Sequence, residues 1–313
     1  MRETINVAVL GTGFGAYHVE LYSQMPNVDK LIVWGRNAEK RKELQKKFHV
    51  EVTDDMEAIW NDRQIDMVDI CLPNHLHKEI SIRALQAGKD IFIETPVAES
   101  AEDADAILKT AEQCGRRAFV DLFLRFEYPY QFLYEIAKSS KYGVLKELLV
   151  KRETSPWWGN LDTKHIGLNL MIHDVDFAVR LMGEPDSVLS DGIGVREGQS
   201  LVMARLNYKN AAAFIRGASA MPGKYPFSVG YEAVFENAVV RYYEDGFDDR
   251  TETKLVVFSD ENKEEIPLPQ ANCYEGVIKH VLQCLRTGES SCLDIQEAAN
   301  TLKTVLLINQ QLM

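Results

Sequence analysis

Short apolar runs alternate with helix-like segments through residues 5–121 of the chain. The apolar runs are continuous, as in Val7-Ala-Val-Leu10, and this is typical of strands buried on both faces of a parallel sheet that helices cover. Strands are predicted at residues 5–10, 31–34, 67–72, 90–93 and 117–121, and helices at residues 16–25, 38–48, 77–87 and 101–114. The alternation predicts an α/β domain with a doubly wound parallel sheet over residues 1–121.

The pattern changes after residue 121. Two helix-like segments, residues 130–139 and 168–182, precede a series of segments in which apolar and polar positions alternate, as in Val202-Met-Ala-Arg-Leu-Asn207. Strands are predicted at residues 187–195, 201–208, 211–218, 227–236, 238–243 and 254–258, and closing helices at residues 274–286 and 295–312. Residues 122–313 are therefore predicted to form a second α/β domain with a large, mostly antiparallel open sheet. One sheet face is expected to be solvated or used for association.

Composition excludes several classes of partner. The 313 residues are 46% hydrophobic, which is enough for two cores, and the formal net charge is -12. An acidic surface repels phosphate backbones and anionic lipids, so neither nucleic acid nor membrane is expected as a partner. No apolar stretch approaches the roughly 20 residues that span a bilayer, and the first apolar run ends in glycines. The expected location is the cytoplasm.

The five cysteines form no CxxC pair, and the chain has no His/Cys cluster with zinc spacing. Reduced and mostly buried thiols are the interpretation that fits a cytosolic protein, and no metal site is expected. The cysteines are Cys71, Cys114, Cys273, Cys284 and Cys292.

A glycine-rich loop follows the first predicted strand and precedes the first predicted helix. Gly11, Gly13 and Ala16 fit the pattern G-x-G-x-x-G/A, with Thr12, Phe14 and Gly15 between them. The first glycine allows a tight turn, the second lets a pyrophosphate approach the backbone, and the small third residue lets the helix pack close to the sheet. The helix N-terminus offers free N–H groups to the anion. The loop predicts a dinucleotide-binding Rossmann domain.

The end of the second strand indicates which nicotinamide cofactor is preferred. A carboxylate there would bind the ribose 2′-hydroxyl of NAD, but this chain has Gly35 followed by Arg36, with Lys40 and Arg41 one turn on. An arginine without a carboxylate favours the 2′-phosphate of NADP. The alternative is that these basic residues merely form the solvated start of a helix. NADP is therefore expected, with NAD as the other choice.

The chain resembles the Gfo/Idh/MocA family, the group of glucose–fructose oxidoreductase and inositol dehydrogenase, along nearly its whole length. The motifs are Cys71-Leu-Pro-Asn74-His-Leu-His77, Ala84-Leu-Gln-Ala-Gly88-Lys89, Phe92-Ile-Glu94-Thr95-Pro96, Arg125-Phe126, Gly143-Val-Leu145, Asn169-Leu-Met-Ile-His173-Asp-Val-Asp176 and Leu285-Arg-Thr-Gly288. The resemblance implies an NAD(P)-dependent oxidoreductase that acts on a sugar, nucleotide sugar or cyclitol. It also implies a homodimer or homotetramer formed through the C-terminal sheet.

The resemblance also assigns residues to the cofactor. Pro73, Asn74 and His77 are expected near the cofactor, and Glu94 is expected to shape the loop beside the nicotinamide. Tyr274 lies at a position where family members often have a polar aromatic residue facing the substrate.

Two residues depart from the family's catalytic pattern. The family's lysine falls on Thr95, and its acidic residue falls on Asn169, so that only His173 matches. Hydride transfer from a carbinol carbon requires a group that takes up the hydroxyl proton. Threonine can orient a hydroxyl but is no comparable base, so His173 is the expected acid/base. The alternative is that His173 only packs in a helix.

Other residues could supplement the site. His165, Asn169 and His173 are spaced i, i+4, i+8 and share one face if the helix reaches back to His165; if the helix begins at Gly167, His165 lies in a loop. His165 or Lys164 could compensate for the missing lysine. A metal between the two histidines is disfavoured, because two helical turns separate them by about 12 Å. Trp157 and Trp158 could stack against a sugar ring or form a partly buried patch.

Three functions remain open at this point. The first is an active NADP-dependent dehydrogenase or reductase of a sugar-like alcohol that uses His173. The second is a cofactor-binding sensor or regulator with little turnover, favoured by the loss of the lysine and the acid. The third is redox-assisted glycoside cleavage with a tightly held cofactor.

Overall fold

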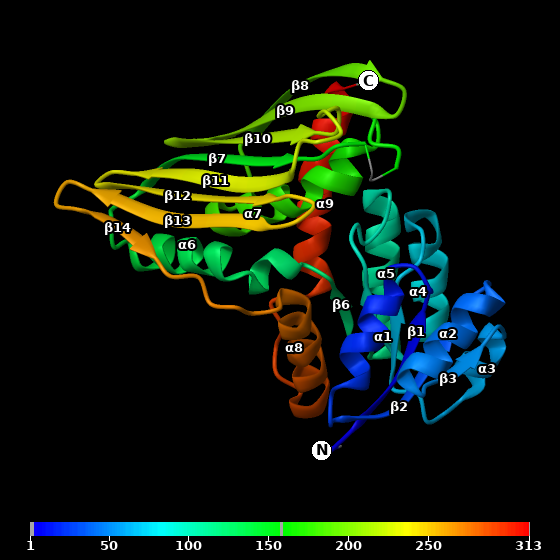
Figure 1. The fold of residues 1–313 in the computed structure, drawn as a ribbon. Helices are drawn as coiled ribbons and strands as arrows, with labels where there is room; N and C mark the ends of the chain where they lie inside the picture. The colour runs from blue at the N-terminus through cyan, green and yellow to red at the C-terminus, as the bar shows by residue number, and fades with distance from the viewer. Residues whose placement is uncertain (1–2, 157–158, 313) are drawn as a thin grey trace. The chain divides into compact units, whose positions relative to one another are not determined.

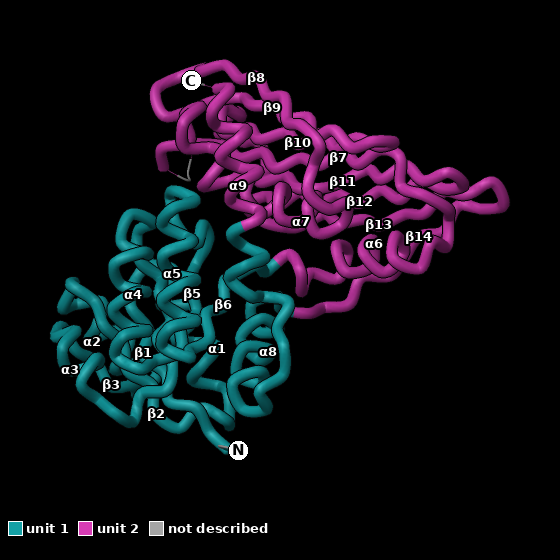
Figure 2. The backbone as a smooth tube through the Cα atoms, turned by 180° about the vertical axis from the view of Figure 1, so that it is seen from behind, with its two compact units in different colours: residues 1–123, 272–299 teal, residues 124–271, 300–313 magenta. Residues whose placement is uncertain are grey.

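The computed structural model describes residues 3–156 and 159–312. They form two compact units, residues 1–123 with 272–299 and residues 124–271 with 300–313 (Figure 2). The change of unit near residue 123 lies close to the boundary expected at 121. The return of residues 272–299 to the first unit differs from the prediction of one continuous second domain.

Helix α8 (Cys273–Thr287) causes this return. Its apolar stripe is buried at Val277, Ile278, Val281 and Leu282, and the helix contacts α1 and β1 of the first unit. An amphipathic helix shows in its sequence that it covers an apolar surface, but it does not show which surface. The assignment of α8 to the first unit is therefore decided by tertiary packing.

The first unit has a parallel sheet with the strand order β3-β2-β1-β4-β5-β6. Figure 1 labels β1, β2, β3 and β6 of this sheet. The direction of strand order reverses between β1 and β4, and this switch point is where ligands of such sheets bind. The strands are β1 (Ile5–Leu10), β2 (Val28–Trp34), β3 (Glu51–Thr53), β4 (Met67–Ile70), β5 (Asp90–Ile93) and β6 (Ala118–Val120). The expectation of a doubly wound parallel sheet is confirmed.

Five further helices belong to this unit: α1 (Gly15–Ser23), α2 (Ala38–Phe48), α3 (Met56–Asn61), α4 (His77–Gln86) and α5 (Ala101–Cys114). Local signals fix several of their ends. Asn37 and Ser100 cap α2 and α5 by accepting backbone N–H groups of the first turn, and Gly115 ends α5 in the left-handed conformation. The short β3 and α3 were not predicted, because neither carries enough apolar residues to show a period.

The second unit is built on an eight-stranded sheet with the order β14-β13-β12-β11-β7-β10-β9-β8. All neighbours are antiparallel except β7 and β10, which confirms the expected mostly antiparallel sheet. Its strands are β7 (Leu145–Glu153), β8 (Ser187–Arg196), β9 (Gln199–Tyr208), β10 (Ala211–Ala218), β11 (Phe227–Phe235), β12 (Ala238–Gly246), β13 (Thr251–Ser259) and β14 (Lys263–Ile266).

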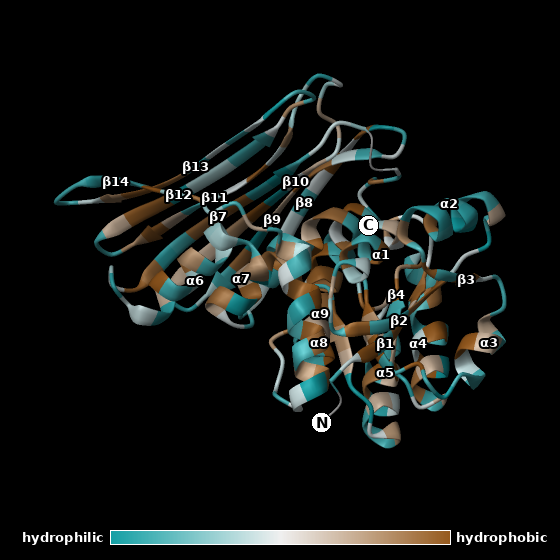
Figure 3. Ribbon diagram, turned by 60° about the horizontal axis from the view of Figure 1, so that its bottom comes forward, coloured by the Kyte–Doolittle hydropathy of each residue, from teal (hydrophilic) through white to brown (hydrophobic). Residues whose placement is uncertain are grey.

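The two faces of this sheet have different surroundings. Helices α6 (Tyr128–Ser139) and α7 (Ile172–Met182) run along one face, where alternate strand residues such as Leu148, Val150 and Ile215 are buried (Figure 3). The opposite face exposes apolar side chains on three of the strands, namely Leu149 of β7, Leu189 and Ile193 of β8 and Met203 of β9. The alternation seen in the sequence thus has one buried and one exposed face.

Candidate functional site

The glycine loop between β1 and α1 lies against the end of β4. Gly11 has φ +127°, and a Cβ added to it would come within 2.3 Å of the Cys71 carbonyl oxygen. A Cβ on Gly15 would meet Cys71 Cβ at 3.1 Å and Val9 Cγ1 at 3.2 Å, whereas one on Gly13 would meet nothing within 4 Å. Packing therefore requires Gly11 and Gly15, and Gly13 leaves an open approach to the backbone. The close contact of helix and sheet falls on Gly15, one residue before the expected Ala16.

The end of β2 meets the same loop. A Cβ on Gly35 would lie 2.5 Å from Thr12 Cγ2, so the two segments are in direct contact. Arg36 is exposed, and no carboxylate pairs with it among the described residues. Arg41 instead donates to the carbonyl of Gly35 and to Asp54. Arg36 therefore remains available to an anion, whereas Arg41 is engaged within the protein.

A buried polar cluster lies at the carboxyl ends of β4, β5 and β6. The His18 side chain, only 1% exposed, extends from α1, and its Nδ1 lies 2.9 Å from Asp69 Oδ2. Its Nε2 lies 3.2 Å from Glu94 Oε1 and 3.8 Å from Asp121 Oδ2. Cys71 Sγ lies 3.2 Å from Asp69 Oδ1 and 3.5 Å from His18 Nδ1. Three carboxyl groups thus surround one imidazole and one thiol.

The surroundings shift the titration of this cluster. Burial lowers the pKa of His18, but Cys71 and Asp69 outweigh it and raise that pKa well above its usual value. Burial, followed by the charge of Glu94, raises the pKa of Asp121 well above its usual range. Burial, followed by the charge of Asp69, likewise raises the pKa of the Cys71 thiol. The cluster holds more acidic than basic groups. Asp121 and Cys71 therefore lose a proton less readily than usual, and His18 keeps its proton more readily.

Several atoms of the cluster make no hydrogen bond of proper geometry with any described residue. They are His18 Nε2, Glu94 Oε1 and both carboxyl oxygens of Asp121. Buried polar atoms normally have a partner, since leaving one unsatisfied costs about 1–3 kcal/mol. These atoms lie close to one another, with His18 Nε2 3.2 Å from Glu94 Oε1 and 3.8 Å from Asp121 Oδ2, so the cluster is held mainly by charge rather than by well-directed hydrogen bonds.

Four residues of the cluster were not predicted as site residues: His18, Asp69, Cys71 and Asp121. A signal for Asp69 was present, because a charged residue stands inside the apolar strand Met67-Val-Asp69-Ile70 and a buried charge requires partners. The partners themselves come from other elements, and no local pattern shows them.

The loop that contains Thr95 is fixed by a contact between His77 and the carbonyl of Pro96. His77 is buried, and its two ring nitrogens lie 2.8 Å from the carbonyl oxygens of Pro96 and Leu72. Burial lowers the pKa of His77 despite these contacts. His77 therefore connects the loops after β4 and β5, and its ring does not reach the surface. Of the other predicted residues nearby, Pro73 is exposed, and Asn74 and Thr95 are half-buried.

Tyr274 lies beside the glycine loop within the first unit. Its ring stacks on Phe123 at 4.8 Å and meets Phe14 and Tyr17 edge-on at 5.4 and 5.6 Å. Phe14 remains 47% exposed although it belongs to the loop. The head of α8 therefore contributes an aromatic group at the edge of the predicted cofactor site.

The second unit holds the other predicted catalytic residues. Asn169 lies in a π-helical turn, Gly167–Met171, and His173 lies in the first turn of α7. The helix does not reach back to His165, which lies in a turn with Nδ1 2.7 Å from Asp162 Oδ1. His165 was expected either on the face of the helix or in a loop before it, and the structure has it before the helix. The wider π turn also breaks the i, i+4, i+8 face.

His173 is held as a neutral imidazole. Burial, followed by the positive charge of Arg152, lowers its pKa to about 3. Arg152 itself forms a two-pronged pair with Asp174, with N···O distances of 2.9 and 3.0 Å. At neutral pH the ring is therefore unprotonated. Trp157 and Trp158, which precede this region, lie outside the described residues.

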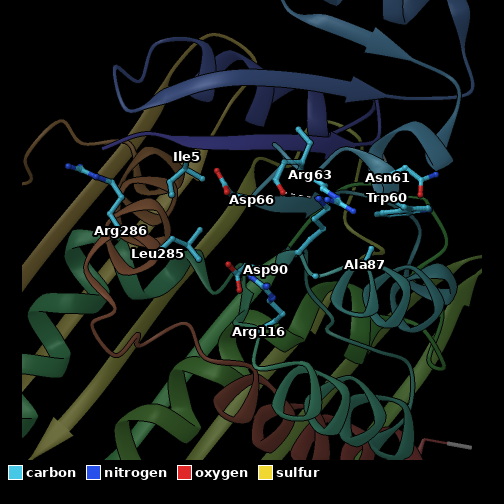
Figure 4. Close-up of a pocket in the computed structure, with 13 residues that line it drawn as sticks. Ile5, Trp60, Asn61, Arg63, Asp66, Ala87, Asp90, Arg116, Leu285 and Arg286 are labelled. Carbon is cyan, nitrogen blue, oxygen red and sulfur yellow. Dashed lines mark hydrogen bonds between the residues drawn. The ribbon is translucent and has the colours of Figure 1, made fainter. Parts of the chain in front are cut away.

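A cavity of about 600 Å³ opens at the other edge of the parallel sheet, where β1, β4, β5 and β6 begin (Figure 4). Arg63, Lys89, Arg116 and Arg286 line it together with Asp66 and Asp90. Helices α4, α5 and α8 end close by, and the partial negative charge of helix C-termini attracts cations. This field favours basic side chains around the cavity.

Comparisons with known proteins agree with the fold. A family model described as "Oxidoreductase family, NAD-binding Rossmann fold" (GFO_IDH_MocA) matches residues 5–122. The chain resembles the scyllo-inositol 2-dehydrogenase (NADP(+)) IolW of Bacillus subtilis, with 22% identity over 97% of this chain and 92% of that protein. It also resembles the 4-carboxy-2-hydroxymuconate-6-semialdehyde dehydrogenase of a Sphingobium species, with 30% identity, over 42% of each chain.

Among solved structures, an oxidoreductase from Agrobacterium radiobacter in complex with NAD+, L-tartaric acid and magnesium matches with a TM-score of 0.85. The two chains are 16% identical, and the match covers 98% of this chain and 96% of that one. Such a likeness shows the shared fold. None of the helices in the described part of the chain is long and apolar enough to cross a membrane.

Proposed function

Because the chain belongs to the Gfo/Idh/MocA oxidoreductase family, we propose that it is an NAD(P)-dependent oxidoreductase of sugar-like alcohols. The observation that carries the proposal is the glycine loop. Gly11 and Gly15 are fixed against Cys71, while Gly13 leaves the backbone open above the switch point of the sheet. The substrate class, a cyclitol, sugar or nucleotide sugar, is supported by relatives named for inositol and glucoside dehydrogenation.

NADP is the preferred cofactor in this proposal. Arg36 is exposed next to Gly35, which contacts the loop through Thr12, and no acidic residue occupies the end of β2. We expect NADPH to bind at least about tenfold more tightly than NADH, and Arg36→Ala to remove most of this difference, as one charge-assisted hydrogen bond is worth about 1.5–3 kcal/mol. Fluorescence titrations of both cofactors measure this. Equal dissociation constants for the wild-type protein would contradict the NADP preference.

The chemistry is a hydride transfer, for which the bound nicotinamide supplies the acceptor or donor carbon. His173 is the proposed acid/base: its neutral ring takes up the hydroxyl proton as the carbinol C–H and O–H bonds break, and returns it in the reverse direction. Thr95 and Asn169 orient the hydroxyl in this scheme, since neither is a base. Glu94 and Asn74 are proposed to bound the cofactor site.

A panel of cyclitols, sugars and nucleotide sugars tests the activity, with absorbance of the reduced nicotinamide as the readout. His173→Ala should lower kcat by about 10²–10⁴-fold without weakening NADPH binding, as expected for loss of a general acid/base. The control is His49→Asn, at an exposed position after α2, which should leave turnover unchanged. Tight cofactor binding with no turnover on any substrate would sink the oxidoreductase proposal.

Association through the large sheet is proposed as well. The exposed face carries Leu149, Leu189, Ile193 and Met203, and exposed apolar side chains gathered on one sheet face are a common feature of interfaces. Light scattering should show a dimer or tetramer, and the pair Leu189→Lys and Ile193→Lys should shift it to smaller species. A monomeric wild-type protein would remove this part of the proposal.

A further inference from the structure

The cavity of about 600 Å³ at the beginning of the parallel strands lies wholly within the first unit (Figure 4). It is at the opposite end of β1 from the glycine loop, because this strand starts at Ile5, in the lining of the cavity, and ends where the loop begins. Its volume falls within the range of about 300–1,000 Å³ that is common for small-molecule sites. The cavity is therefore separate from the predicted cofactor site and large enough for a ligand of its own.

Basic side chains outnumber acidic ones in the lining. The charged residues there are two carboxylates and four basic side chains, namely Asp66, Asp90, Arg63, Lys89, Arg116 and Arg286. Both carboxylates are engaged by the backbone: Asp66 Oδ2 accepts the N–H of Asn6 at 2.9 Å. In the same way, Asp90 Oδ1 accepts the N–H of Arg117 at 2.7 Å. The lining thus has two more positive than negative side chains, in a chain whose formal net charge is -12.

Two arginines of this lining have donors to spare. Arg63 and Arg116 follow α3 and α5 and are exposed, and neither guanidinium forms a hydrogen bond or an ion pair with any residue that the structure describes. Arg116 Nη2 lies beside Gly88, 3.7 Å from the position that a Cβ there would take. The helix ends nearby favour cations, but their carbonyl groups do not bind these two guanidinium groups. The donors of both arginines therefore remain available to an anion.

Lys89 adds a buried cation to the same lining. The residue is only 3% exposed, and its Nζ donates to the carbonyl oxygens of Asp62 and Ile65, to the latter at 3.0 Å. An ammonium group has three N–H donors, so one of them has no partner in the part of the chain that the structure describes. Trp60, also in the lining, has a buried Nε1 that likewise makes no hydrogen bond there. Because a buried charge is costly without a counter-ion, an anion in the cavity would stabilise Lys89.

We propose that this cavity binds a small phosphate monoester with a hydroxylated carbon skeleton. A phosphate monoester carries a charge of about −1.5 to −2 at pH 7, which matches the excess of two positive side chains. The planar fork of an arginine binds two phosphate oxygens at once. The remaining volume accommodates the carbon skeleton, and Asp66 and Asp90 offer carboxylate oxygens to its hydroxyl groups. This site is additional to the proposed oxidoreductase function and does not depend on it.

Isothermal titration calorimetry of the full-length protein, in a buffer without phosphate, tests the proposal. The probe is ribose 5-phosphate, with ribose as the uncharged control and inorganic phosphate as the anion without a skeleton. We expect one ribose 5-phosphate to bind per chain, and ribose to bind at least about tenfold more weakly because it makes no charge-assisted hydrogen bond. Inorganic phosphate should bind with an intermediate Kd, since it fills only part of the cavity.

Substitutions locate the bound phosphate ester. Arg63→Met and Arg116→Met should each weaken the binding of ribose 5-phosphate by about tenfold or more, the effect of losing one charge-assisted hydrogen bond. Lys109→Met removes an exposed positive charge from α5 outside the cavity, and this matched control should change the Kd by less than about twofold. Arg36→Met, beside the glycine loop, should also leave the binding unchanged, which separates the cavity from the predicted cofactor site.

Circular dichroism of each variant establishes that the protein is folded, as expected for substitutions of exposed side chains. Unchanged affinity in both Arg63→Met and Arg116→Met, or loss of binding in Arg36→Met, would overturn the assignment to this cavity. Equal affinity for ribose and its phosphate ester would overturn the role of the anion, and equal affinity for inorganic phosphate would overturn the ester class. The titration requires no turnover, so failure of the oxidoreductase proposal would show separately, in the activity assay alone.

Discussion

The two units bury acidic side chains in opposite ways. In the second unit each buried carboxylate has a matched arginine: Arg125 Nε and Nη2 lie 2.9 and 2.6 Å from Asp176, and Arg152 is paired with Asp174 in the same manner. Thr301 donates a further hydrogen bond to Asp176. In the first unit, Asp69, Glu94 and Asp121 share a single imidazole.

This difference in pairing distinguishes carboxylates that stabilise the fold from carboxylates that are available for function. A two-pronged arginine–carboxylate pair balances the charge of both partners and joins them by two parallel hydrogen bonds, so it links the elements that carry them. A cluster with surplus carboxylates and unsatisfied atoms is maintained at a cost in stability, and such clusters concentrate at functional sites. The same residue types therefore indicate architecture in one unit and chemistry in the other.

Breaking a matched pair should have the largest effect. Arg125→Met leaves Asp176 buried without its arginine, and we expect the free energy of unfolding to fall by about 3–5 kcal/mol. Urea denaturation followed by circular dichroism measures the change. Replacing both partners, with Arg125→Met and Asp176→Leu, should recover much of the loss. If the double variant is no more stable than the single one, the loss comes from packing rather than from the unpaired charge.

Acid should destabilise the second unit through His173. Its folded pKa of about 3 lies below the ordinary value of 6.5, so between these values the unfolded chain binds the extra proton. Stability is then full above about pH 6.5 and declines as the pH falls toward 3, by up to about 1.4 kcal/mol for each pH unit. Denaturation midpoints from pH 7 to 4 should fall less steeply in His173→Asn. Parallel curves would show that other groups control the acid response.

Removing a surplus carboxylate should have the smallest effect. Asp121→Asn replaces a buried carboxyl group that has no arginine partner, and we expect the free energy of unfolding to change by less than about 1 kcal/mol because burial and Glu94 already raise the pKa of this group and disfavour its charged form. Asp176→Asn, the same substitution in the matched unit, should cost several times more. The comparison between the units fails if the two substitutions destabilise the protein equally.

Local signals made part of the site predictable. The run from Val7 to Gly15 specifies strand, turn and helix through neighbouring residues alone, and the structure has these elements in that order. The residue at which α7 begins could not be predicted, because the π turn before it, Gly167–Met171, depends on packing. A Cβ on Gly167 would meet the side chain of Asn309, which lies near the end of α9 (Ile295–Gln311).

The sequence by itself determined the two sheet types and the glycine loop, because apolar period and turn chemistry are local properties. Only the tertiary structure decided that α8 joins the first unit and that Tyr274 lies beside Phe14. It also brought His18, Cys71 and Glu94 together. Parallel strands end at one edge of a sheet, so side chains far apart in the chain meet there, and no pattern along the sequence records that meeting.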